Sequence, residues 1–224
     1  MLSIEKTIER YYKSFVSDSN HRYSSWDNCF KYFRNKKKSK SNNITDLDCL
    51  HLGFYLASWG MYRGSSFLLN KSYKIHHPII KELLNIKYKA LWNLNFEKLT
   101  KDDKDFKLIF KLFQSLKNIY AKKTRKENIS DTLITKVLLG TLCCTPAYDT
   151  YFKNGCSKKK VTPHSNFTEE SFLSVIAFYK KNKKKFDSSC KKIFKQPRLN
   201  YPAMKIIDLY FWQLGKPKDK KHRQ

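Results

Sequence analysis

One carboxylate of this chain has neighbours that point to chemistry. Asp149 follows the tripeptide Pro146-Ala147-Tyr148 and is followed, after one threonine, by Tyr151 and Phe152. Burying a carboxylate among such apolar neighbours is costly unless the group has a partner or a task. Pro146 disfavours a helical conformation in the residue before it, so we expect a new helix to begin near Asp149. Two interpretations stay open: the aspartate acts in a reaction, or it caps this helix.

A second stretch, Trp59-Gly60-Met61-Tyr62-Arg63-Gly64, combines flexible backbone with groups that bind planar or anionic ligands. Its two glycines permit tight turns. Trp59 and Tyr62 offer flat faces, and the planar cation of Arg63 stacks on rings or binds phosphate. The alternative is a tight turn between two helices, with Trp59 packed into the core.

The charge of the chain points to a polyanionic partner. Its 224 residues include 46 Lys or Arg against 19 Asp or Glu, a formal net charge of +27. A surface so one-sided attracts nucleic acid first and an anionic membrane second. The lysines are densest at residues 36–38, 122–126, 158–160 and 180–185. A composition rich in Lys, Asn and Ile is also typical of AT-rich genes, which is the alternative explanation of the charge.

Composition narrows the class of protein further. Hydrophobic residues make up 41% and aromatic residues 15%, enough for one folded core. The six cysteines form no C-x-x-C pair and no histidines have zinc-finger spacing, so we expect no metal site. No segment is typical of a signal peptide or of a membrane span. We therefore expect a cytoplasmic bacterial monomer that associates with the nucleoid when it binds DNA and uses no cofactor.

The elements that must hold these residues are helices. Six glycines and six prolines interrupt the chain, and strand-like alternation is scarce. The predicted helices cover residues 2–16, 24–33, 45–57, 78–91, 102–120, 132–142, 168–179 and 202–215. The helix at 45–57 is apolar almost all round, so we place it at the centre of the fold. The prediction is a single compact all-α domain over residues 1–215, with a flexible basic loop at 35–43 and a disordered basic tail at 216–224.

Part of the chain resembles the helix-hairpin-helix DNA glycosylases. Residues 134–139, a short link and residues 146–152 are similar to the stretch in which that family leads from its hairpin to a catalytic aspartate. The closing residues 201–215 are similar to the last helix of glycosylase-like proteins. The resemblance implies that the fold is glycosylase-like and that the partner is double-stranded DNA with a damaged or modified base.

The DNA-holding hairpin of that family would correspond to residues 125–130, which contain no glycine. We expect Asn128 to supply a left-handed turn there. We expect Ser130 to form a helix start that binds phosphate. The residues expected to contact the DNA backbone are Lys122, Lys123, Arg125, Lys126, Asn128, Ser130 and Lys136.

The resemblance also implies a mechanism. Breaking the bond between base and sugar develops positive charge on the sugar, which the carboxylate of Asp149 would stabilise while it activates a water molecule. The flipped base would enter a pocket lined by Trp59, Tyr62, Arg63 and Tyr148. Family members that also cut the strand carry a lysine near the start of the preceding helix. Residues 130–132 hold Ser, Asp and Thr there, so we predict a monofunctional enzyme.

Two questions stay open at the level of the sequence. The distance from housekeeping repair enzymes favours a specialised target, such as a modified base in phage DNA, and with it a role in antiviral defence. The alternative function is a non-catalytic basic helical protein that binds nucleic acid. That alternative predicts salt-sensitive binding without product and a routine helix cap at Asp149.

Overall fold

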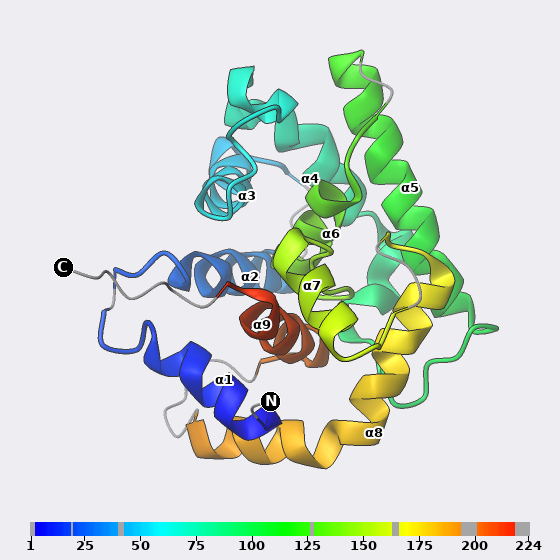
Figure 1. Cartoon of the computed structure of the whole chain (residues 1–224). Helices are drawn as coiled ribbons and strands as arrows, with labels where there is room; N and C mark the ends of the chain where they lie inside the picture. Colours follow the sequence, from blue (N-terminus) through cyan, green and yellow to red (C-terminus); the bar gives the residue numbers. More distant parts are fainter. Residues whose placement is uncertain are drawn as a thin grey trace.

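The computed structural model describes residues 3–18, 20–39, 43–125, 128–162, 166–193 and 201–217. These residues form helices and links and contain no strand, which confirms the all-α prediction (Figure 1). The α-helices are α1 (Ile4–Lys13), α2 (Ser24–Lys38), α3 (Asp46–Ser58), α4 (His77–Leu83), α5 (Lys104–Thr124), α6 (Asp131–Gly140), α7 (Thr150–Lys158), α8 (Glu169–Ile193) and α9 (Ala203–Gly215). Three short 3-10 helices are η1 (Phe67–Asn70), η2 (Tyr73–His76) and η3 (Ile86–Asn93). The predictions at Lys126 and at residues 218–224 lie outside the described residues.

Several helices begin where capping residues predict it. Thr45 accepts a hydrogen bond from the backbone N–H of Asp48, whose carboxylate in turn accepts from the N–H of Thr45. This reciprocal pair satisfies two backbone donors at the start of α3. Ser130 caps α6 by accepting from the N–H of Leu133. The caps therefore place the start of both helices at the residues expected from the sequence.

Helices α7 and α9 cross at unusually short range near the middle of the helical body (Figure 1). A Cβ atom added to Gly155 would lie 2.0 Å from the carbonyl oxygen of Phe211, and one on Gly215 would lie 1.7 Å from that of Tyr151. Only glycine permits such an approach of two backbones. The crossing brings the start of α7, and with it Asp149, against the inner face of α9.

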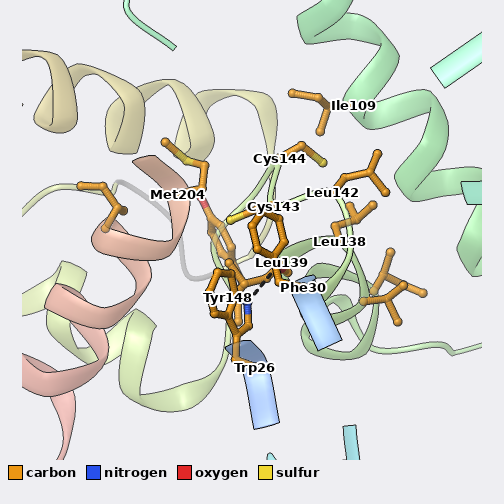
Figure 2. Packing of buried hydrophobic residues seen from close by; sticks show 14 of the residues in the cluster. Trp26, Phe30, Ile109, Leu138, Leu139, Leu142, Cys143, Cys144, Tyr148 and Met204 are labelled. Atoms are coloured by element: carbon orange, nitrogen blue, oxygen red, sulfur yellow. Dashed lines mark hydrogen bonds between the residues drawn. The ribbon is translucent and has the colours of Figure 1, made fainter. Parts of the chain in front are cut away.

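The core beside this crossing is aromatic and sulfur-rich. The indole N–H of Trp26 on α2 donates to the carbonyl oxygen of Leu139 on α6 at 3.0 Å, and the ring stacks on Phe30 (Figure 2). Cys143 and Cys144 are buried in the link between α6 and α7. The link is thus held inside the core, which fixes the path of the chain toward Asp149.

The prediction of a loop at residues 35–43 is wrong for the first half of that range. Helix α2 continues to Lys38, and residues 40–42 are not described. The ammonium of Lys36 donates to the carboxylate of Asp48 at 3.0 Å and to the carbonyl oxygen of Asn43. A polar run does not end a helix when its lysines have good helix propensity and one of them finds a buried partner.

Two other expectations need correction. The helix predicted at 78–91 ends at Leu83, because Asn85 leaves the helix and caps η3 by accepting from the N–H of Lys87. Helix α3 lies toward the outside of the molecule (Figure 1). It exposes an apolar stripe along one face. The exposed fractions are 53% at Leu47, 44% at Leu50 and 67% at Phe54. The other helices therefore cover only one side of this helix, although it is apolar almost all round.

Candidate functional site

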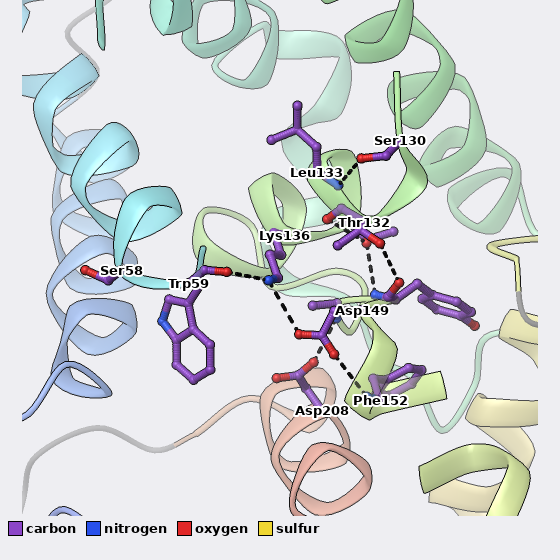
Figure 3. A network of polar contacts seen from close by, with 12 residues as sticks. Ser58, Trp59, Ser130, Thr132, Leu133, Lys136, Asp149, Phe152 and Asp208 are labelled. Atoms are coloured by element: carbon purple, nitrogen blue, oxygen red, sulfur yellow. Dashed lines mark hydrogen bonds and ion pairs between the residues drawn. The ribbon is translucent and has the colours of Figure 1, made fainter. Parts of the chain in front are cut away.

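Four charged side chains meet where α6, α7 and α9 come together. We call Lys136, Asp149, Lys205 and Asp208 the charged cluster. Lys136 comes from α6, Asp149 stands at the start of α7, and the other two are one turn apart on α9. Figure 3 shows Lys136, Asp149 and Asp208 converging on one point between these helices. Because charges are rarely buried without need, this cluster is the strongest candidate site in the described part of the chain.

Asp149 has two different contacts, one for each carboxylate oxygen. Oδ1 accepts a hydrogen bond of 3.0 Å from the N–H of Phe152, so the aspartate caps α7. Oδ2 lies 3.5 Å from the ammonium nitrogen of Lys136. The side chain is 14% exposed. The helix-cap interpretation is therefore observed, and the second oxygen faces the interior of the cluster.

Lys136 is held inside the protein. Its ammonium donates to the backbone carbonyl oxygen of Trp59 at 2.7 Å and pairs with Asp149. Burial lowers the pKa of Lys136, while the nearby carboxylates of Asp149 and Asp208 oppose that change. The prediction that Lys136 contacts the DNA backbone needs correction, because its side chain is 7% exposed and its ammonium is engaged on the inside.

Asp208 completes the cluster from α9. Its Oδ1 accepts from the N–H of Ala147 at 2.8 Å, and its Oδ2 lies 3.9 Å from the ammonium of Lys205. Burial raises the pKa of Asp208 to about 7, and the neighbouring charge of Asp149 adds to this rise. The bond to Ala147 ties α9 to the segment that leads into Asp149.

Aromatic rings surround the ammonium group of Lys205. It lies 4.7 Å from the ring centre of Trp26, 5.4 Å from that of Trp59 and 6.0 Å from that of Tyr11. Ring faces attract a cation and replace part of its lost hydration. The ring of Trp59 also stacks on Tyr23, and its N–H donates to Ser25. Trp59 thus forms one wall of the cluster.

The space inside the cluster is small. Its lining includes Tyr55, Trp59 and Trp212 as well as the four charged residues, and its volume is about 10 Å³. Such a volume holds roughly one water molecule. A nucleobase or sugar reaches Asp149 only if this wall moves.

The structure separates the residues predicted to line a base pocket. Trp59 borders the cluster, and the guanidinium of Arg63 folds back over Gly60 while its charge acts on Lys136. Tyr148 is buried, and its hydroxyl meets that of Ser171 at 3.1 Å. Tyr148 therefore lies in the core, away from the carboxylate of its neighbour.

Tyr62 belongs to a different buried network. Its hydroxyl lies 2.8 Å from Nε2 of His76, and Nδ1 of that histidine lies 2.8 Å from the hydroxyl of Tyr120. Burial lowers the pKa of His76 to about 3, so the ring is neutral at ordinary pH. A neutral histidine that bridges two hydroxyls is a structural link, and it turns Tyr62 away from the cluster.

The predicted DNA-binding residues lie along the connection from α5 to α6. Lys122, Lys123, Arg125, Asn128 and Ser130 are exposed. Arg125, at the start of this connection, is left-handed, with φ 54°. Ser130 caps α6 as predicted. The exposed cations therefore gather at the end of α5 and before α6, whose own Lys136 points inward.

Sequence reasoning missed Lys205 and Asp208. Both stand in a strongly apolar closing helix, so the argument applied to Asp149 would have identified them too. What the sequence does not reveal is that residues about 60 positions apart meet, because that depends on the crossing of α7 and α9.

Among the described residues, no three His, Cys, Asp or Glu side chains are arranged to hold a metal ion. None of the helices in these residues is both long enough and apolar enough to cross a bilayer. Comparisons of the chain with protein-family models, curated proteins and solved structures give no match.

Proposed function

We propose that this protein is a DNA glycosylase-like enzyme that excises a damaged or modified base, with Asp149 as its catalytic carboxylate. The observation that carries the proposal is the charged cluster, in which the free oxygen of Asp149 lies 3.5 Å from a buried lysine. Ionisable groups in such surroundings are typical of active sites, since burying them costs stability. The net charge of +27 supports DNA as the partner.

In the proposed reaction, the oxygen of Asp149 that faces Lys136 stabilises the positive charge that develops on the deoxyribose. The same oxygen accepts a proton from the attacking water and the sugar gains a hydroxyl. The base leaves with the electron pair of the broken bond and takes up one proton, so that the net reaction adds one water molecule. The capping bond from Phe152 holds the carboxylate in place. Lys136, fixed by the carbonyl of Trp59, balances the charge of Asp149 before DNA arrives.

Access to the cluster is the main requirement of this proposal. With a free volume of about 10 Å³, the sugar approaches Asp149 only after the turn that begins at Trp59 has moved. Gly60 and Gly64 have positive φ angles of 78° and 60° in that turn. Glycines tolerate such angles and their change without steric cost, so the turn is the part of the wall best suited to open.

The test is base release from duplex DNA. Purified protein is incubated with duplexes that each carry one altered base, including uracil, hypoxanthine, alkylated purines and the modified pyrimidines of phage DNA. Abasic sites are then counted after alkaline cleavage. We expect product from at least one duplex. The variant Asp149→Asn should lower the rate by roughly 10³-fold, because a neutral amide does not offset the charge on the sugar.

Two controls make the result specific. Asparagine is as good a helix cap as aspartate, so Asp149→Asn should keep the fold. The matched variant Asp103→Asn alters a half-buried aspartate at the start of α5, far along the chain from the cluster, and should release the base at the rate of the unaltered protein. Abasic sites from none of the duplexes, or equal rates with and without the Asp149 carboxylate, would refute the proposal.

A second candidate function is binding of nucleic acid without chemistry. The capping bond of Asp149 and the small space beside it favour this alternative. It predicts that affinity for duplex DNA falls steeply with salt, since exposed lysines release counterions from phosphates. Anisotropy titrations from 50 to 200 mM salt measure that slope. A steep fall of affinity with salt, together with no base release, would favour this function over the first.

A further inference from the structure

A cavity of about 460 Å³ lies apart from the space at Asp149, between α2, η3, the link after α6 and the start of α9. We call it the α2 cavity. Its volume falls within the roughly 300–1,000 Å³ of sites that hold small molecules. Trp26 lies between the two regions, because its ring stacks on Phe30 of the cavity and also contacts the ammonium of Lys205. The cavity is thus a separate site.

One wall of the α2 cavity is cationic. Lys31, Arg34 and Lys38 stand on α2 at spacings of three and four residues, so they form one row along the helix. No carboxylate is among the described residues that line the cavity. In the described part of the chain, no salt bridge joins these three cations to an acid. Their charge is therefore available to an anionic ligand.

Arg34 is already held in position. Its Nη1 donates to the carbonyl oxygen of Trp92 and to the side-chain oxygen of Asn93, and its guanidinium lies 5.8 Å from the ring centre of Phe30. These bonds use one nitrogen, and a guanidinium has further N–H donors on Nη2 and Nε. An arginine fixed in this way binds the oxygens of a phosphate at little entropic cost.

The rest of the lining suits a planar, partly polar group. Half-buried Leu94 and the largely buried rings of Phe30 and Phe96 supply apolar lining, while Asn35 and Asn93 supply amides. Aromatic rings bind the faces of nucleobases, and amides form hydrogen bonds with their edges. A cationic row beside such a surface matches a molecule with a phosphate at one end and a base at the other.

We propose that the α2 cavity binds a nucleoside phosphate, with Arg34, Lys31 and Lys38 on the phosphate and the apolar lining at Leu94 and Phe96 against the base. The same chemistry is present in a free nucleotide and at the phosphorylated end of a nucleic-acid strand. The inference does not depend on Asp149, and it holds whether or not the protein releases bases.

The test is calorimetric titration of the full chain with 5′-dAMP at low salt, beside deoxyadenosine and inorganic phosphate. We expect dAMP to bind at least about 10-fold more tightly than either part alone, because both ends of the cavity are then occupied. Equal affinity for dAMP and phosphate, or for dAMP and deoxyadenosine, would overturn the proposal. Tighter binding of a fatty acid such as oleate than of dAMP would also overturn it.

Variants locate the binding. Arg34→Gln should weaken dAMP at least about 10-fold, since it removes the prepositioned donors. Because Arg34 also bonds to the backbone of η3, the double variant of Lys31→Gln and Lys38→Gln removes two charges from the rim without touching those bonds, and we expect a similar loss. Lys107→Gln on the exposed face of α5 should change affinity by less than 2-fold. Unchanged affinity in both cavity variants would refute the site.

Two further titrations separate the source of the ligand from the function at Asp149. A 5′-phosphorylated oligonucleotide that competes with dAMP, where its 5′-hydroxyl counterpart does not, identifies a strand end; competition by free nucleotides alone identifies a free nucleotide. Asp149→Asn should bind dAMP as the unaltered chain does. Loss of base release with intact dAMP binding, or the reverse, therefore tells which of the two proposals fails.

Discussion

The charged cluster and the α2 cavity both hold cations, but they differ in how that charge is balanced. In the cluster, Lys136 and Lys205 are buried and each lies within 4 Å of an aspartate oxygen. In the α2 cavity, the cations on α2 face an open volume with no carboxylate in its described lining. The protein supplies the counter-charge in the first region, whereas in the second a ligand has to supply it.

This difference in charge balance determines whether each region has to change conformation before a ligand enters. A buried, paired cluster is rigid and costly, because desolvation of its charges is only partly offset by their attraction. An open row of cations costs little and stays hydrated until an anion displaces the water. Under the two proposals, the cluster is therefore a preorganised reaction site that must open, and the cavity is a binding site that is already open.

The largest expected effect comes from removing the charge that Asp208 acquires with rising pH. Burial raises its pKa from the usual 3.8 to about 7, in a site faced by Lys205, Asp149 and Lys136. Between these pH values the unfolded chain has released a proton that the folded chain still holds. The contribution of Asp208 to the free energy of unfolding is therefore complete below about pH 4 and is lost as the pH rises to about 7. The total loss is about 4 kcal/mol.

The measurement compares the unaltered chain with Asp208→Asn by urea unfolding from pH 4 to 7.5. The asparagine still accepts from Ala147 and does not ionise, so the variant should gain about 4 kcal/mol relative to the unaltered chain across this range. His76 acts oppositely, because its lowered pKa makes stability fall toward acid, but it is common to both proteins. Asp102→Asn, which alters an exposed aspartate just before α5, is the control. Parallel pH profiles would contradict a buried, protonatable Asp208.

The next effect contrasts one lysine from each region. Lys205→Met removes a buried cation, leaves Asp208 without its partner on α9, and should lower the free energy of unfolding by about 3 kcal/mol. Lys31→Met removes an exposed cation from the rim of the α2 cavity and should change it by less than about 0.5 kcal/mol. Urea unfolding at pH 7 measures both. Equal effects of the two substitutions would remove the distinction between balanced and unbalanced cations.

The smallest effect supplies the missing counter-charge to the α2 cavity. Asn35 is exposed on α2 between Lys31 and Lys38, so Asn35→Glu places a carboxylate within reach of both. Relative to the isosteric Asn35→Gln, the free energy of unfolding should rise by about 0.5 kcal/mol at low salt. Calorimetry should show dAMP affinity at least about 10-fold lower with glutamate than with glutamine. Equal affinities would show that the row is not the anion site.

The helical nature of the chain, most helix starts and the unusual position of Asp149 follow from the sequence alone. These features depend on neighbours in the chain: apolar spacing, caps such as Thr45 and Ser130, and a proline three residues before the aspartate. The same local logic failed at residues 35–38, because Lys36 finds Asp48 from another helix. The spacing of residues within α2 does not predict that partner.

Only the tertiary structure decided which charges meet. Lys136 points inward to Trp59 and Asp149, and Asp208 reaches the link before α7, because Gly155 and Gly215 let α7 and α9 approach closely. The assembly of the α2 cavity from distant segments has the same origin. Contacts between residues far apart in sequence depend on how helices cross, and a one-dimensional pattern of apolar positions does not specify that crossing.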